Sequence, residues 1–350
     1  MVILAIESMK RQLLRSMLLA LPLGLMSSPI FAMPLTAQEI LKEFNLVVLG
    51  DANSTSHVDG RSYVAGNLSG GDYVQHPNDT NSSAYAGLTV QGNASNVHVN
   101  GLGAVVGKDL SGSTINSGSA VVLGKASNDS FNGSAYVGTV GTGNNFNGGQ
   151  NPALKTGTAA QAATSTNFAN VLSDFSNHIK ALDSTGSSVT VNGNRATFNA
   201  VAGANGVAVF NLADSALFTS VIAEYAFNLN GATTVIINSG AKDITISANF
   251  LGGSAQAIGS KILWDFYDAT NLTITSQFGG SILASDASFK NTANIEGGVY
   301  VNTLNQQAEI HLQSFTGTVP DTSPVPEPTT ILLFGTGLAG LTGIIRRKKA

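Results

Sequence analysis

Residues 261–284 read KILWDFYDATNLTITSQFGGSILA, and three short apolar runs stand out in this stretch. Similar runs recur between residues 229 and 302, and Gly, Asn, Ser or Asp separates each run from the next. The runs are Val235–Ile237, Ile244–Ile246, Lys261–Trp264, Leu272–Ile274, Ser281–Ala284 and Gly298–Val301. Short runs of β-formers bounded by turn residues are typical of strands. No long helical pattern interrupts them, so the stretch predicts successive coils of a solenoid.

Similar short runs occur between residues 84 and 140 and again between 189 and 212, and along them inward residues alternate with outward ones. In the first of these segments the runs are Leu88–Val90, Val97–Val99, Ala104–Gly107, Ala120–Gly124 and Ala135–Gly138. Their spacing varies and no strict motif recurs. Each coil of a solenoid buries its inward residues on the next coil. We therefore predict a mainly β fold, a right-handed parallel β-solenoid, with a β-sandwich as the alternative.

Two segments have a helical pattern instead. Thr36 and Glu39 form a capping box that predicts a short helix ending near Phe44. After a predicted loop at residues 139–157, one apolar stripe predicts a long flanking α-helix of about 20 residues or more, which Gly186 ends. The stripe consists of Phe168, Val171, Leu172, Phe175, Ile179 and Leu182. We expect this helix to pack against the solenoid, and a membrane-surface helix is the alternative.

The composition is unusual for a cytosolic enzyme. The chain has 350 residues, of which 43% are hydrophobic and only 11% charged, with 39 Gly and no Cys. Residues 33–324 hold 10 of the 17 basic and 19 of the 21 acidic residues, a net charge of about −9. Such an acidic body should not attract nucleic acid. The absence of Cys excludes disulfides and thiolate metal sites, so we expect stability from packing and backbone ladders alone.

The first 32 residues have the features of a signal peptide. A basic start at Lys10 and Arg11 precedes an apolar stretch from residue 13 to about residue 26. Small residues follow, and cleavage after Ala32 is expected. A membrane anchor is the alternative interpretation of these residues. Met9 is the alternative start of the protein. We therefore expect residues 1–32 to be a signal peptide and residues 33–319 to form the exported body.

Residues 44–67 read FNLVVLGDANSTSHVDGRSYVAGN. This segment resembles the opening of the choice-of-anchor A family, in which an FN-apolar-LG-D segment precedes a V-x-G-R-x-x-V-G-G-N run. The matching residues are Phe44, Asn45, Leu49, Gly50, Asp51, Val58, Gly60, Arg61, Val64, Gly66 and Asn67. Ala65 stands where the family more often has Gly, a departure that affects turn geometry.

Three later segments also resemble this family. They are residues 262–266 (ILWDF), 279–284 (GGSILA) and 295–299 (IEGGV). Asp265 stands where the family usually has Asn, and Ser285 stands where it usually has Pro. Together with the opening segment, these motifs extend the resemblance over about residues 44–302. It implies an adhesive or structural part in an extracellular polysaccharide matrix, without catalysis.

Residues 320–350 combine a Pro-rich linker with a further motif. Val325, Pro326, Glu327 and Pro328 precede 15 uncharged residues and a basic end that includes Arg346 and Arg347. This arrangement resembles the PEP-CTERM sorting signal, which implies cleavage by the membrane protease exosortase. Fifteen helical residues span roughly 22 Å, less than the ~30 Å hydrocarbon core. We expect transient inner-membrane anchoring, then cleavage and release to the outer surface or matrix; a permanent single-span anchor is the alternative.

The sequence offers little chemistry, and we predict no catalytic residues, no cofactor and no metal site. The five histidines are His57, His76, His98, His178 and His311, and none is spaced from another as metal ligands usually are. Asp51, Asn53, Thr55 and Asp59 have the spacing of a calcium loop's first positions. Ser56 and Ser62 stand where that loop needs Gly and Glu, so turn capping is the favoured interpretation.

Three functions stay open. We predict a non-catalytic adhesin or exopolysaccharide-associated protein, whose ladder of Asn, Ser and Thr would hydrogen-bond sugar hydroxyls. The first alternative is an ice-binding protein that uses outward Thr190, Thr245 and Thr273. The second is a polysaccharide lyase, for which Arg61, Lys108 and Arg195 are scattered candidate bases. The ligand, the oligomeric state and any calcium requirement do not follow from the sequence.

Overall fold

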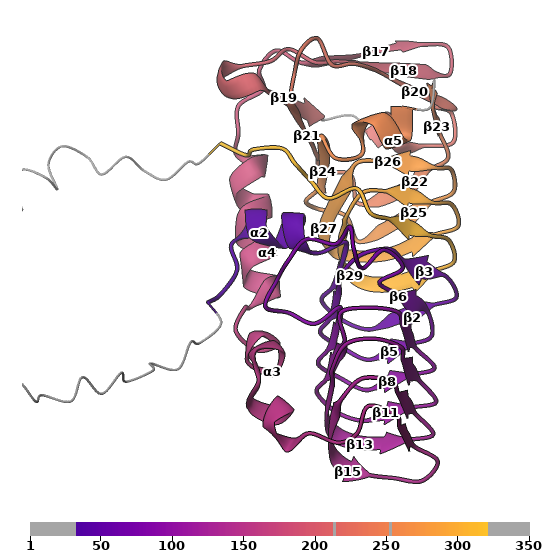
Figure 1. The fold of residues 1–350 in the computed structure, drawn as a ribbon. Coiled ribbons are helices and arrows are strands. Elements are labelled where there is room, and N and C mark those ends of the chain that lie inside the picture. The colour runs from indigo at the N-terminus through magenta and orange to yellow at the C-terminus, as the bar shows by residue number, and fades with distance from the viewer. Residues whose placement is uncertain (1–32, 213–214, 252–253, 321–350) are drawn as a thin grey trace, which may run out of the picture. The chain divides into compact units, whose positions relative to one another are not determined.

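The computed structural model describes residues 33–320 except 213–214 and 252–253, and these residues form a parallel β-solenoid with three faces (Figure 1). Strands of successive coils pair in parallel register along each face. A β-sandwich would pair its strands antiparallel, so the predicted solenoid is confirmed and the alternative is excluded. The expected signal peptide and sorting segment lie outside the described residues.

The first face is buried on both sides. Its strands are β19 (Val207–Leu212), β21 (Thr234–Ser239), β24 (Ile262–Phe266), β27 (Ser281–Asn291), β29 (Val299–Gln306), β1 (Leu46–Val48), β4 (Ser62–Val64), β7 (Leu88–Val90), β10 (Ala104–Val106), β13 (Ala120–Ser127) and β15 (Ala135–Val140). Inward residues line the solenoid core, and helices cover most outward ones. Tyr63 of β4, for example, stacks on helix residue Phe168 with ring centroids 3.9 Å apart.

The second face is exposed on its outer side, and we call it the open face. It is built from β22 (Asp243–Ile246), β25 (Asn271–Ile274), β2 (Ala52–Ser54), β5 (Leu68–Ser69), β8 (Ala94–Ser95) and β11 (Leu110–Ser111). The C-terminal parts of β27, β29, β13 and β15 turn the corner from the first face and complete it. Buried and exposed residues alternate along β22, as a half-buried strand requires.

The third face is a separate sheet of nine two-residue strands. In spatial order they are β26 (Phe278–Gly279), β28 (Ile295–Glu296), β30 (Ile310–His311), β3 (His57–Val58), β6 (Asp72–Tyr73), β9 (His98–Val99), β12 (Thr114–Ile115), β14 (Ser130–Phe131) and β16 (Asn145–Phe146). One apolar residue of each strand points into the core. β16 lies within residues 139–157, so the loop predicted there is only partly correct.

The coils do not follow chain order. β1 pairs with β4, its successor, and also with β29 near the end of the body. β2 and β3 likewise pair with β29 and β30. The body therefore begins in the middle of the solenoid and winds to one end (Figure 1). From there the chain runs along the outside of the solenoid, through α3 (Thr158–Ala162) and α4 (Phe168–Lys180), to the opposite end. It then winds back from the other end until the last coil meets the first, and we call this junction the seam. The seam satisfies backbone groups that an edge strand would leave open.

The return path contains the flanking helices. These are the 3-10 helix η1 (Pro152–Thr156), α3 and α4. A further helix at the start of the body, α2 (Ala37–Glu43), lies beside α4. The capping box of α2 is confirmed. α4 has 13 residues, so the predicted length of about 20 was wrong. Beside its end, Asn238 of β21 donates to the Ile179 carbonyl and Asn211 of β19 to that of Leu182. Among the described residues no helix is long and apolar enough to cross a membrane.

A small sheet covers the far end of the solenoid. It contains β17 (Ser188–Asn192), β18 (Arg195–Asn199), β20 (Glu224–Asn228) and β23 (Asn249–Phe250). β17 and β18 pair antiparallel, whereas β18, β20 and β23 pair in parallel. The short helices η2 (Ala204–Gly206), η3 (Ser215–Phe218) and α5 (Ser254–Ile258) connect the strands of this region. The sheet closes the core at that end.

Candidate functional site

The outer side of the open face carries a continuous column of polar residues. Strand register places these residues next to one another from coil to coil: Thr245, Thr273, Lys290, Asn305, Asn53, Ser69, Ser95, Ser111 and Ser127. Adjacent strands of a sheet lie about 4.8 Å apart. The column therefore presents hydroxyl, amide and ammonium groups at a fixed and regular spacing across the seam.

A second column on the same face is held by hydrogen bonds between coils. Asp51 Oδ1 accepts from the backbone N and the Nδ2 of Asn67, and Asn67 Oδ1 accepts from the same two atoms of Asn93. Asn93 Oδ1 accepts from the Asp109 backbone N, and Asp109 Oδ1 from that of Lys125. Each carboxyl or amide group thus binds the backbone of the next coil, which fixes these side chains rigidly. We call this column the Asx ladder.

The two columns enclose a shallow depression of about 380 Å³, lined by Asp51, Asn67, Ser69, Asn93 and Ser95, with the apolar Ala52 and Leu68 at its floor. Its rim offers acceptors and donors, whereas the side chains of Ala52 and Leu68 beneath it are buried in the core. This rim suits the hydroxyls of a sugar ring.

The three predicted threonines do not share one face. Thr245 and Thr273 are register neighbours on the open face. Thr190 lies instead in β17, where it pairs with Thr197 of the end sheet. Beyond Thr273 the column continues with Lys290 and Asn305, so the threonines form no continuous array.

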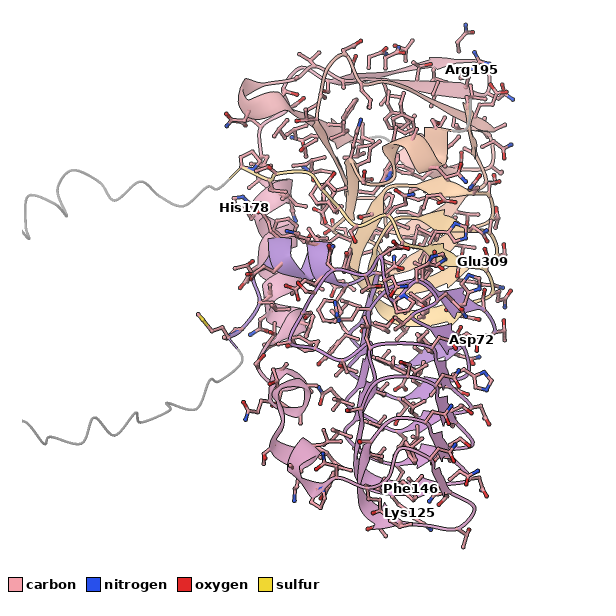
Figure 2. All side chains as sticks on the ribbon, in the orientation of Figure 1. Asp72, Lys125, Phe146, His178, Arg195 and Glu309 are labelled. Atoms are coloured by element: carbon pink, nitrogen blue, oxygen red, sulfur yellow. The ribbon has the colours of Figure 1, made fainter. Side chains whose placement is uncertain are left out.

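The third face gathers four of the five histidines with five carboxylates. This histidine cluster consists of His57, His76, His98 and His311 together with Asp59, Asp72, Asp79, Glu296 and Glu309. Figure 2 shows Asp72 and Glu309 on the side of the solenoid opposite His178 of α4. The cluster crosses the seam, because His57 and Asp59 belong to the first coil and Glu309 and His311 to the last.

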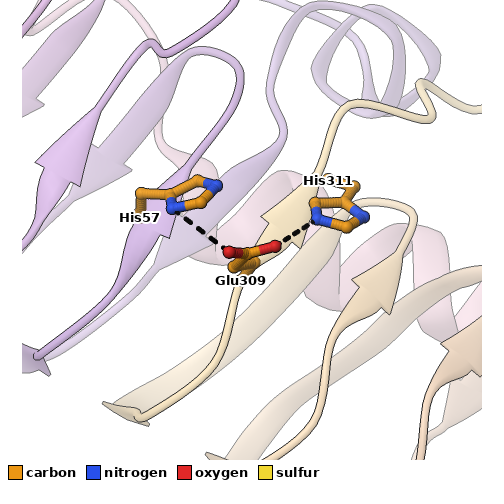
Figure 3. Close-up of side chains that lie close together, drawn as sticks. All are labelled: His57, Glu309 and His311. Atoms are coloured by element: carbon orange, nitrogen blue, oxygen red, sulfur yellow. Dashed lines mark hydrogen bonds and ion pairs between the residues drawn. The ribbon is translucent and has the colours of Figure 1, made fainter.

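Glu309 lies between two histidine rings at the centre of the cluster (Figure 3). Its Oε2 is 2.7 Å from His311 Nε2, and its Oε1 is 3.7 Å from His57 Nδ1. The other ring nitrogen of His311 is 2.9 Å from Glu296 Oε1. Hydrogen bonds to Glu296 and Glu309 raise the pKa of His311 to about 9 against the opposing effect of burial. The imidazolium thus bridges two carboxylates at neutral pH.

Comparison with known families identifies the body and the tail. The family described as "Putative Ice-binding-like adhesive domain" matches residues 37–312. The chain belongs to this ice-binding-like adhesive domain family. The PEP-CTERM protein-sorting motif matches residues 324–349, which implies an exported protein that exosortase sorts to the cell surface. No curated protein and no solved structure matches the chain.

In this adhesive domain the three candidate lyase bases do not form a cluster, and Arg61 and Arg195 make structural contacts. Arg61 is buried and donates to the backbone carbonyls of Tyr85, Glu43 and Asn81. Burial lowers the pKa of Arg61 to about 10. Arg195, at the far end of the solenoid (Figure 2), pairs with Glu224 at 2.7 Å. Lys108 is exposed near the open face. The membership in an adhesive family favours a non-catalytic role for them.

The residues of the possible calcium loop diverge in the fold. Asp51 begins the Asx ladder, Asn53 points outward on the open face, and Asp59 belongs to the histidine cluster. The favoured turn-capping interpretation was wrong for Asp51 and Asp59, because Asp51 binds the next coil and Asp59 Oδ2 accepts from the distant Leu312 backbone N. The sorting residues Val325–Pro328, Arg346 and Arg347 and the cleavage residue Ala32 lie outside the described residues.

The sequence analysis missed the histidine cluster, because about 250 residues separate His57 from its partners Glu309 and His311. One signal could have revealed it. His57-Val58-Asp59 and Glu309-Ile310-His311 are the same pattern, an inward apolar residue between two ionisable residues. In a solenoid two such segments on one face place their ionisable side chains together.

Proposed function

We propose that this protein is a non-catalytic adhesin or matrix protein that binds extracellular polysaccharide through its open face. Its membership in an adhesive family and its sorting motif support a role outside the cell. The observation that carries the proposal is the pair of polar columns on the open face, of which the Asx ladder is locked by coil-to-coil hydrogen bonds. Rigid groups lose little conformational entropy on binding, so many weak hydrogen bonds to sugar hydroxyls can add up.

Maturation is part of the same proposal. Removal of residues 1–32 after Ala32 and cleavage near Val325–Pro328 by exosortase would release residues 33–319 and the remaining linker. The motifs at residues 44–67 and 262–299 further support placing the chain in the choice-of-anchor A group. Mass spectrometry of the exported protein should find the basic tail missing; an intact Ala350 would contradict the cleavage.

Binding is tested by retention of the exported protein on purified exopolysaccharide, with and without calcium. Ser69→Val combined with Ser111→Val removes two hydroxyls from the open face and keeps residues that suit strands. The matched control combines Thr114→Val with Ser130→Val, at outward positions on the third face. We expect at least a threefold loss of retention for the open-face pair and none for the control.

Equal losses in both variants, or no retention of the unchanged protein on any polysaccharide, would contradict the proposal. Ice binding has less support, because Lys290 and Asn305 interrupt the threonine column. Reshaping of ice crystals by the protein would restore that alternative.

A further inference from the structure

The histidine cluster contains three metal-ligating side chains in reach of one another. One ligand atom each of His57, Glu309 and His311 lies within 4.8 Å of the other two. All three side chains are partly exposed, with relative exposures of 29%, 39% and 26%. A cation could therefore reach them from solvent, and the side chains have room to rotate.

The spacing is close to what a small cation needs. Zinc binds imidazole nitrogen and carboxylate oxygen at about 2.0–2.2 Å, which places tetrahedral ligand atoms roughly 3.3 Å from one another. His311 Nε2 is 2.7 Å from Glu309 Oε2 and His57 Nδ1 is 3.7 Å from Glu309 Oε1, distances on either side of this value. One ligand atom from each of the three residues lies within 4.8 Å of the other two. Small side-chain rotations would equalise them around a central ion.

Each histidine has a carboxylate on its other ring nitrogen. His311 Nδ1 is 2.9 Å from Glu296 Oε1, an oxygen that Gln277 Nε2 also contacts at 2.7 Å. His57 Nε2 lies 3.5 Å from Asp59 Oδ1. A carboxylate behind a metal-binding histidine fixes the tautomer and the ring orientation and makes the ligand more basic. Both histidines therefore have the supporting partner that metal sites usually contain.

Asp59 gives an independent indication that a ligand belongs here. The residue is 7% exposed, and its Oδ2 accepts a hydrogen bond from the Leu312 backbone N. Its Oδ1 is buried and makes no hydrogen bond among the described residues, although His57 Nε2 and His76 Nε2 approach it at 3.5 and 3.7 Å. A buried carboxylate oxygen held only by such long contacts is costly. If His57 bound an ion through Nδ1, its Nε2–H would donate to this oxygen and remove the cost.

We infer that His57 Nδ1, Glu309 and His311 Nε2 bind one divalent transition-metal cation, which displaces the proton from His311 Nε2, with solvent completing the coordination. Two imidazoles and one carboxylate suit zinc and its neighbours, whereas calcium and magnesium prefer oxygen ligands. The ion would link the first coil of the body to the last. In a chain without cysteine, such a link would stabilise the seam as a disulfide could, by closing a loop of about 250 residues.

The inference is independent of the polysaccharide ligand and is tested with Zn²⁺ and Co²⁺ alone. Calorimetric titration of the exported protein with Zn²⁺ should show one site per chain, and Co²⁺ should give visible absorption bands. Saturating Zn²⁺ should raise Tm by several degrees, since it binds only the folded state. The absence of a saturable site, or equal affinity for Ca²⁺, would overturn the inference.

Two variants locate the site. Glu309→Gln keeps the size of the side chain and should weaken Zn²⁺ binding at least tenfold, and His57→Ala should do the same. The matched control is His98→Ala, which removes an exposed histidine paired with Asp72 at 2.8 Å on the same face. The control should retain full Zn²⁺ affinity. Loss of binding in the control but not in Glu309→Gln would place the ion elsewhere and contradict the assignment.

Discussion

The solenoid consists of two regions whose coils differ in length. In the narrow coils, residues 46–146, equivalent positions such as Asn93, Asp109 and Lys125 lie 16 residues apart, although a longer loop separates Asn67 from Asn93 by 26. In the wide coils, residues 188–291, equivalent positions lie 27 to 29 residues apart near the far end. A longer coil encloses a wider interior, so the two regions need different side chains to fill the core.

The wide coils fill their interior with aromatic rings. Trp264 is fully buried and lies within 6.5 Å, centroid to centroid, of seven other rings. The narrow coils instead stack Leu, Val and Ala, as in the series Leu88, Ala104, Ala120 and Ala135. Close packing at native density requires this match of side-chain volume to interior width.

The narrow coils compensate for smaller apolar side chains with polar ladders. The Asx ladder runs along the open face, and a second ladder joins Asn100, Asn116, Asn132 and Asn147 on the third face. Glycines allow the coils to approach closely at the corners. Ring packing therefore distinguishes the core of the wide coils, whereas the narrow coils combine a core of smaller side chains with polar ladders between coils.

Replacing the central ring should have the largest effect. Trp264→Ala should reduce the free energy of unfolding by about 3–5 kcal/mol, through the cavity and the loss of the Nε1–H bond to the Gly279 carbonyl. Val106→Ala in the narrow coils should cost about 1–3 kcal/mol. Urea denaturation measures both changes. Equal costs would show that the two cores do not differ as described.

The buried Asp265 in the wide coils should make stability depend on pH. It accepts a 2.7 Å hydrogen bond from Ser176 of α4, and burial raises its pKa to about 8, despite nearby Lys180. The folded state keeps a proton that the unfolded state releases above pH 4. Stability should therefore fall between pH 4 and pH 8, by up to about 1.4 kcal/mol per unit.

Asp265→Asn should abolish this decrease, because the amide cannot ionise and can still accept from Ser176. Thermal melts from pH 4.5 to pH 8.5 measure the slope, and Asp183→Asn, at an exposed position, serves as the control. An unchanged slope in Asp265→Asn would show that other groups cause the pH dependence.

Gly66 tests the close approach of the narrow coils. A Cβ there would lie closer than 3.0 Å to Asp51 Oδ1 and to the Gly50 carbonyl, which begin the Asx ladder. Gly66→Ala should cost about 2–3 kcal/mol of stability. Gly157→Ala is the matched control, because the nearest atom to its Cβ would be 3.3 Å away. Similar melting temperatures of the two variants would contradict the packing argument.

The smallest expected effect concerns one ladder residue. Asn93→Ala removes the side-chain hydrogen bonds from Asn93 Nδ2 to Asn67 Oδ1 and from the Asp109 backbone N to Asn93 Oδ1, and it should cost about 0.5–1.5 kcal/mol, since these groups are exposed. Ser69→Ala, a neighbour on the same face, should cost less than about 0.5 kcal/mol. Chemical denaturation compares the two. No difference between them would show that the ladder orders the surface without stabilising it.

Much of the fold followed from local patterns. The strands around Ile244 and Leu272, the capping box of Thr36 and the apolar stripe of α4 were all predicted from neighbouring residues. The length of α4 was not, because the side chains that contact the carbonyls around its end, Asn211 and Asn238, belong to strands that are distant in sequence. The polar character of the open face was expected, but its columns depend on register between coils that do not follow chain order.

The sequence alone determined that the chain is a coiled stack of short strands with a sorting motif, because periodicity and composition are local properties. Only the tertiary structure decided which coils are neighbours. Inserting the first coil beside the last satisfies the backbone groups of both, and this pairing places His57 next to Glu309 and His311. Contacts between residues so distant in sequence depend on how the chain closes, which no local pattern encodes.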